Sequence, residues 1–177
     1  MAEIITIDPT GDNITGIFTY YGGLLFDFTS YQEKKWTWHH NFISSFVKER
    51  KPRLVIYEDN IRIKTSKGFI NDHYRNLLKS IGGIELILET QQIPSKIIYS
   101  SFTKYAEREA EKGNIGGLVR IKKPREEGKE TRGAKKKAWV FKRQEIDEHQ
   151  KDALLLFWIY WTRMEKKIWP WINNSYN

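Results

Sequence analysis

Residues 3–8 read Glu-Ile-Ile-Thr-Ile-Asp, and this stretch decides the fold class more than any other part of the chain. Its β-branched residues favour a strand, and the run ends at an acid, Asp8. Residues 14–20 are also rich in β-branched residues, residues 24–28 are mostly apolar, and both favour further strands; Tyr21-Gly22-Gly23 between them is typical of a turn. Strands joined by such short connections pair antiparallel. The sequence therefore predicts an opening antiparallel meander.

The rest of the chain alternates between helical and strand-like patterns. Residues 38–51 repeat apolar side chains at the spacing of an amphipathic helix, and Pro52 ends the pattern. Residues 53–57 (Arg-Leu-Val-Ile-Tyr) then indicate a buried central strand, followed at once by Glu58. This order predicts an α/β fold with a central mixed five-stranded sheet, antiparallel strands first and parallel strands after, flanked by helices. The further elements that we expect are helices at residues 71–88, 103–112 and 145–167 and a strand at residues 96–100, with Gly82-Gly83 interrupting or kinking the first of these helices.

The composition indicates one soluble domain. With 177 residues, of which 40% are hydrophobic, the chain can bury a core as a single domain over residues 1–177. It has no cysteine, which excludes a disulfide framework, a thiolate zinc site and a cysteine nucleophile. The longest apolar run, residues 153–161, is far shorter than the roughly 20 residues of a membrane span, and the first residues lack a signal-peptide pattern. We expect a cytoplasmic protein (acting in the host cytoplasm if phage-encoded), with neither a membrane nor an organic cofactor among its partners.

Positive charge is concentrated in one segment. The formal charge of the chain is +8, and residues 120–143 alone hold eleven Lys or Arg and three Glu. A localised basic segment favours binding to a polyanion, although a solvated loop kept basic for solubility gives the same pattern. Residues 113–137 are glycine-rich and basic without apolar periodicity, so we expect a basic loop or β-hairpin insertion there. The candidate DNA contacts are Arg62, Lys64 and Lys67, which follow Glu58, and Arg132, Lys135, Lys136 and Lys137 in the basic segment.

Acidic residues stand at the ends of predicted buried strands. Asp8 ends the first strand and Glu58 the fourth, and crossover connections place these strands side by side in many mixed sheets. In the last helix His149 and Asp152 are three residues apart and share a face, with Glu145 and Glu148 one turn before them. Carboxylates suit Mg²⁺ or Mn²⁺, and two such ions can hydrolyse a phosphodiester. Each residue also has a simpler explanation: Asp8 could cap a turn, Glu58 could be a solvated strand end, and the helical pair could lie on the surface.

Three motifs carry a resemblance to a known family. They are Ile7-Asp8-Pro9 followed by Thr15-Gly16, the strand Leu54-Val55-Ile56-Tyr57-Glu58, and the run His149-Gln150-Lys151-Asp152-Ala153-Leu154. In these motifs the chain resembles the RuvC family of Holliday-junction resolvases, over residues 4–157. The resemblance implies an RNase H-like fold, a homodimer, two Mg²⁺ or Mn²⁺ ions per active site, and paired symmetric nicks across a four-way junction. It also implies that the metal-binding and catalytic set is Asp8, Glu58, His149 and Asp152, with Asp147 or Glu148 in place of His149 if the register is shifted.

Two departures from the family pattern leave the substrate open. The family often has an aromatic residue shortly after the second acid, where this chain has Ile61, and the insertion at residues 113–137 is longer and more basic. The alternatives are another RNase H-like nuclease, acting on flaps, other branched DNA or RNA–DNA hybrids, and a non-catalytic nucleic-acid-binding module. All four acid or histidine positions are filled, which favours an enzyme.

Aromatic residues crowd the end of the last predicted helix. Trp158, Tyr160 and Trp161, with Trp169 and Trp171 beyond, could stack on bases, but a helix this apolar favours the core or a subunit interface. Together Phe157, Trp158 and Trp161 exceed what one helix face buries in a small domain, which favours an interface. A twofold dimer would present two active sites to the two equivalent scissile strands of a four-way junction. We therefore expect a homodimer.

Overall fold

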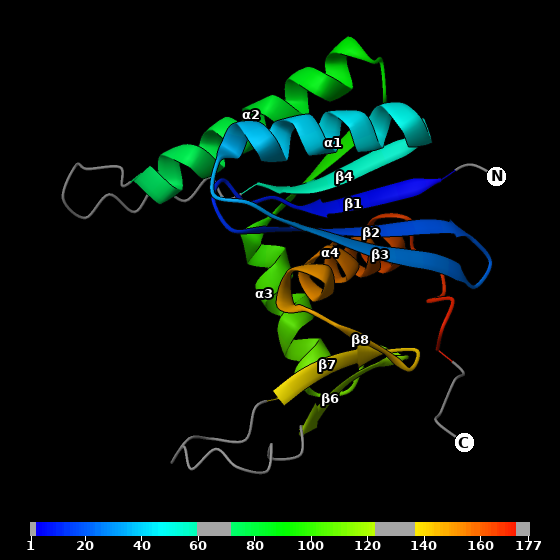
Figure 1. Ribbon diagram of the computed structural model, residues 1–177. Coiled ribbons are helices and arrows are strands. Elements are labelled where there is room, and N and C mark those ends of the chain that lie inside the picture. The colour runs from blue at the N-terminus through cyan, green and yellow to red at the C-terminus, as the bar shows by residue number, and fades with distance from the viewer. Residues whose placement is uncertain (1–2, 60–71, 123–136, 173–177) are drawn as a thin grey trace, which may run out of the picture.

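The computed structural model describes residues 3–59, 72–122 and 137–172, apart from the side chains of Lys122 and Lys137, and a five-stranded mixed sheet lies at its centre (Figure 1). The sheet has the order β3-β2-β1-β4-β5, in which β1, β2 and β3 pair antiparallel while β4 runs parallel to both β1 and β5. The predicted mixed sheet is therefore confirmed. Its strands are β1 (Ile4–Asp8), β2 (Ile14–Gly22), β3 (Leu25–Gln32), β4 (Leu54–Asp59) and β5 (Ser95–Tyr99).

Helices cover both faces of this sheet (Figure 1). One face carries α1 (Trp36–Arg50) and α2 (Asp72–Thr90), and the other carries α4 (Glu148–Ile159) with α3 (Ser100–Glu111) beside it. Successive side chains of a strand point to opposite faces. Ile5 and Ile7 of β1 therefore join the core under α1 and α2, whereas Ile4 joins the core under α4. By the same alternation Asp8 belongs to the α4 face.

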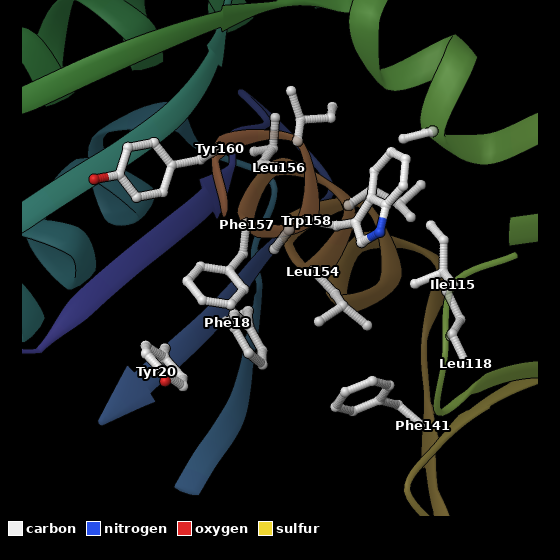
Figure 2. Close-up of a cluster of buried hydrophobic side chains, with 14 of the residues drawn as sticks. Phe18, Tyr20, Ile115, Leu118, Phe141, Leu154, Leu156, Phe157, Trp158 and Tyr160 are labelled. Atoms are coloured by element: carbon white, nitrogen blue, oxygen red, sulfur yellow. The ribbon is translucent and has the colours of Figure 1, made fainter. Parts of the chain in front are cut away.

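A smaller antiparallel sheet closes the core on the α4 side (Figure 1). It consists of β6 (Leu118–Lys122), β7 (Lys137–Phe141) and β8 (Gln144–Ile146), in that order. β6 and β7 pair as the two arms of a hairpin, one of the two forms expected for the insertion, and residues 123–136 lie outside the described residues. In Figure 2, Phe141 of this sheet and Phe157 of α4 approach Phe18 of β2, with ring centroids 6.5 Å and 5.2 Å from it.

α4 begins later and ends earlier than the helix expected at residues 145–167. The side chain of Asp147 accepts a hydrogen bond from the backbone of Gln150, and the Gln150 side chain accepts one from the backbone of Asp147. This reciprocal cap begins the helix at Glu148. The placement of Glu145 on the same helix is therefore wrong, because Glu145 lies in β8. A short π-helix, Tyr160–Met164, follows α4.

α2 runs through Gly82-Gly83 without the expected interruption. A Cβ on Gly83 would lie 2.7 Å from Nδ1 of His40 on α1, whereas a Cβ on Gly82 would meet nothing within 4 Å. Gly83 thus allows the two helices to approach each other closely. The glycine serves packing between α1 and α2 rather than a break in the helix.

The aromatic residues at and after the end of α4 belong to the core of the chain itself. Trp158, Trp169 and Trp171 are all buried, and the Trp171 ring lies 4.8 Å from that of Trp169 and 5.2 Å from that of Phe141. Burial leaves these three rings no face for a base. Trp161 is only partly buried and packs against the same core, so the subunit interface stays a prediction. The homodimer stays a prediction. Of the helices that the structure describes, none has the length and apolar content to span a membrane.

Candidate active site

Two acidic residues lie next to each other where the parallel strands β1 and β4 end. The register pairs Ile7 with Tyr57, so Asp8 and Glu58 are the next residue along each strand. Both side chains alternate onto the face covered by α4, and both residues are 8% exposed. The predicted adjacency of the first and fourth strands is confirmed. The roles of the two acids stay predictions.

Small and hydroxyl-bearing residues bring α4 into direct contact with the strands beneath it. Thr6 of β1 is fully buried and donates a 2.6 Å hydrogen bond to the carbonyl oxygen of Ala153. Gly16 of β2 pairs with Asp8 and leaves room for the backbone of His149, because a Cβ on Gly16 would lie 2.1 Å from the His149 carbonyl oxygen. The first turn of α4 therefore lies directly over the strand ends that carry the acids.

His149 and Asp8 form a contact across the site. Nδ1 of His149 lies 2.7 Å from Oδ2 of Asp8. Because a carboxylate only accepts, the imidazole proton sits on Nδ1, and in the neutral ring Nε2 keeps its lone pair. Burial raises the pKa of Asp8, and the hydrogen bond from His149 offsets only part of that rise. The same hydrogen bond raises the pKa of His149.

Glu58 is held by a hydroxyl group from α3. Thr103 Oγ1 donates to Oε1 of Glu58 over 2.7 Å. Burial raises the pKa of Glu58 to about 7; the Thr103 hydrogen bond lowers it, and the charges of Asp8 and Asp152 raise it. This coupling shows that the three acids share one electrostatic environment. The sequence-based prediction missed Thr103, and nothing in the sequence around it marks it.

Asp152 is paired with a lysine that the sequence-based prediction also missed. Nζ of Lys151 lies 3.0 Å from Oδ1 of Asp152, and Lys151 is only 2% exposed. Burial raises the pKa of Asp152 to about 6, while the charge of Lys151 lowers it and the charge of Asp8 raises it. The sequence did hold a signal, because Lys151 lies just before the apolar run at residues 153–159.

The donor chemistry of this site fits a divalent cation. Asp8, Glu58 and Asp152 are carboxylates and His149 is an imidazole, and Mg²⁺ or Mn²⁺ accepts oxygen and imidazole ligands. Asp8 and Glu58 are buried and Asp152 is half-buried, and burial raises the pKa of all three. Such acids are costly to keep ionised together unless positive charge compensates them. Within the part of the chain that the structure describes, no three histidine or acidic side chains already form a cluster that could hold a metal ion. The fit therefore rests on donor chemistry and charge coupling rather than on a preformed cage.

The remaining candidates lie elsewhere. Glu148 forms an ion pair with Lys151 at 2.8 Å, and Asp147 caps α4. Both side chains are engaged in these contacts, and the residue that contacts Asp8 is His149. Lys137 is the first residue of β7. The other proposed DNA contacts, and the position after Glu58 where the family often has an aromatic residue, lie outside the described residues: Arg62, Lys64, Lys67, Arg132, Lys135, Lys136 and Ile61.

The sheet order and the helices on both faces belong to one class of protein fold. This is the RNase H-like α/β fold, in the form found in RuvC. Two solved structures of RuvC from Thermus thermophilus, one of them in complex with a Holliday junction substrate, match the chain with a TM-score of 0.55 each. They are 13% and 14% identical to it, and the matches cover 88% and 92% of this chain and 90% and 96% of theirs.

Other comparisons add little to this likeness. The structure of YeaZ from Pseudomonas aeruginosa is 13% identical with a TM-score of 0.48, over 93% of this chain and 94% of its own. No protein-family model matches the sequence, and no curated protein matches it. The comparisons therefore establish the fold, and the activity must be argued from the site.

Proposed function

We propose that this chain is a divalent-metal-dependent endonuclease that cleaves branched DNA, with four-way junctions as its substrate. The observation that supports it most is that three elements, β1, β4 and α4, bring four candidate side chains to one end of the sheet. Asp8 and Glu58 come from neighbouring strand ends, and His149 and Asp152 come from the helix packed over them. Neighbouring carboxylates in a partly buried site are suited to hydrolysis of a phosphodiester with divalent cations.

In this proposal the residues divide the chemistry between them. Asp8, Glu58 and Asp152 would hold two divalent cations, which when bound supply the positive charge that activates a water and stabilises the leaving oxygen. His149, whose Nδ1 proton is held by Asp8, presents Nε2 as a ligand or as the acceptor of a proton from the attacking water. Thr103 restrains Glu58 through Oε1 and leaves its other oxygen available.

The basic segment would supply the main contact with DNA. Lysine and arginine bind phosphates without reading sequence, which suits an enzyme that recognises a branch by its shape. Trp139 of β7, within this segment, donates a hydrogen bond to Glu148 in the first turn of α4. The basic segment is thus attached beside the helix that carries His149 and Asp152. The lysines and arginines that follow Glu58 are proposed as a second contact.

Four-way junctions are proposed over other branched DNA on two grounds. The three sequence motifs resemble the RuvC family, and a RuvC of the same fold is solved in complex with a Holliday junction substrate. A homodimer belongs to this proposal, because a junction presents two equivalent strands to be nicked. Flaps and RNA–DNA hybrids are the alternative substrates for the same site.

The test is cleavage of a labelled four-way junction, beside a flap, an RNA–DNA hybrid and a linear duplex, in Mg²⁺, Mn²⁺ or EDTA. We expect cation-dependent cleavage of the junction that is lost in Asp8→Asn. Binding should be retained or tightened in this variant, because a negative charge beside the phosphates is removed. The matched control is Asp72→Asn, which neutralises an acid whose side chain is 91% exposed on α2. Cleavage of the flap or hybrid instead would change the substrate, and tight binding without any cleavage would contradict an enzyme.

A further inference from the structure

Lys151 is a buried lysine at the edge of the candidate active site. Its Nζ lies 3.0 Å from Oδ1 of Asp152 and 2.8 Å from Oε2 of Glu148, both on its own helix. A third carboxylate, Glu107 of α3, lies 3.2 Å away. The Trp139 ring of β7 also lies beside the ammonium group, with its centroid 5.4 Å from Nζ. Lys151 therefore joins α4 to α3 and β7 around one buried positive charge.

The three carboxylates around this lysine are not equivalent. The side chains of Glu148 and Glu107 are 61% and 48% exposed, whereas that of Asp152 is 34% exposed. Solvent screens the first two ion pairs more strongly, so the pair with Asp152 is the least weakened of the three. Burial lowers the pKa of Lys151, but Asp152 and Glu148 outweigh burial and raise it, so the side chain stays charged.

Only one of these partners also belongs to the candidate active site. Asp152 is coupled to Asp8 and Glu58, and the charge of Lys151 reaches Asp8 as well. The contact uses Oδ1 of Asp152 and leaves its second carboxylate oxygen available to another partner.

We propose that Lys151 is a positioning residue for the cation site: its ammonium fixes one oxygen of Asp152, leaves the other to face a cation, and by its charge limits how tightly that cation is held. This inference rests on the nuclease site proposed above. A divalent and a monovalent charge about 5–6 Å apart repel each other, even at the dielectric constant of water (about 80), strongly enough to change affinity about tenfold. The loss of orientational restraint on one carboxylate is a smaller effect.

The test is Mn²⁺ binding to the full chain without DNA, measured by isothermal titration calorimetry. Lys151→Met keeps the apolar stem and removes the charge, so we expect it to bind Mn²⁺ about tenfold more tightly than the wild type. At saturating Mn²⁺ it should nevertheless cleave DNA more slowly, because Asp152 is no longer fixed. Lys151→Arg should restore both properties. A purely structural role predicts weaker binding together with slower cleavage, and equal or weaker Mn²⁺ binding by folded Lys151→Met would overturn the proposal.

A second variant and two controls complete the design. If Lys151→Met does not fold, Lys151→Gln keeps a hydrogen-bond donor without the charge and should also tighten Mn²⁺ binding. Lys104→Gln removes the same charge from an exposed position on α3, and its affinity should stay within about twofold of the wild type. Asp8→Asn separates the two proposals. Unchanged Mn²⁺ binding by Asp8→Asn would mean that the proposed function fails. Weakened Mn²⁺ binding by Asp8→Asn, together with unchanged Mn²⁺ binding by Lys151→Met, would overturn only the role of Lys151.

Discussion

Adding one carbon atom to β2 tests how closely α4 must lie on the sheet. In Gly16→Ala the new Cβ would lie 2.1 Å from the carbonyl oxygen of His149 and 2.7 Å from the amide nitrogen of Gln150. Ordinary van der Waals contact begins at 3.4 Å, so the helix and the strand would have to separate by roughly 1 Å. The atoms on both sides belong to the backbone of regular elements, so no side-chain rotation can relieve the overlap.

The size of the effect follows from these contacts. Overpacking of a core costs typically about 1–3 kcal/mol, and more where backbones must move. Separation of α4 from the sheet also stretches the Thr6–Ala153 hydrogen bond and the contact of His149 with Asp8, each worth about 1 kcal/mol. We therefore expect Gly16→Ala to lower the free energy of unfolding by about 3–5 kcal/mol. The fraction that remains folded should bind Mn²⁺ more weakly, because His149 is displaced from Asp8.

The assay is urea denaturation followed by circular dichroism, with Gly82→Ala as the matched control. A Cβ on Gly82 meets nothing within 4 Å, so alanine there should be neutral or should stabilise α2 by up to about 1 kcal/mol through its higher helix propensity. A free energy of unfolding for Gly16→Ala within about 0.5 kcal/mol of the wild type would refute the reasoning. It would mean that α4 does not rest on β2, and the placement of His149 over Asp8 would be lost with it.

Two further predictions concern pH and the start of α4. In EDTA, the free energy of unfolding should fall as pH rises from about 4.5 to about 7. Burial raises the pKa of Glu58 to about 7 and that of Asp152 to about 6, so the folded chain binds more protons than the unfolded chain in this range. The folded chain loses this advantage as the protons dissociate. The loss from Glu58 is at most about 3 kcal/mol; a thermal unfolding midpoint that rises over this range would contradict the prediction, and saturating Mg²⁺ should flatten the dependence. Asp147→Ala should lower the free energy of unfolding by about 1 kcal/mol in urea denaturation, because the cap of α4 is removed, and an unchanged value would show that the cap adds no stability.

The main sheet could be predicted because its signals are local. Runs of β-branched or apolar residues separated by turn-forming residues identify β1, β2 and β3, and Pro52 marks the boundary between α1 and β4. The start of α4 could not be predicted in this way. Lys142 and Arg143 form the turn between β7 and β8 with φ values of 50° and 72°, in a conformation that glycine and asparagine usually supply. Without that turn signal, the short strand that contains Glu145 looks like the first turn of the helix.

In the candidate site, too, the residues marked by local sequence patterns could be predicted and those defined by distant contacts could not. Asp8, Glu58 and Asp152 could be named from sequence, because each stands at the end or the beginning of a buried run. Thr103 and Lys151 could not be assigned roles, because their contacts join distant segments: Thr103 meets Glu58 across 45 residues, and Lys151 meets Glu107 of α3 across 44. Patterns of period 2 and 3.6 predict which face a side chain takes, but they do not predict which partner it meets on that face.

The most direct test of the proposed nuclease is to map nicks on a four-way junction, with each of its strands labelled in turn. In Mg²⁺ we expect one nick in each of two opposing strands, at the same distance from the branch point, and none in EDTA or with Asp8→Asn. Undiminished cutting by Asp8→Asn would contradict the assignment of the active site to the ends of β1 and β4.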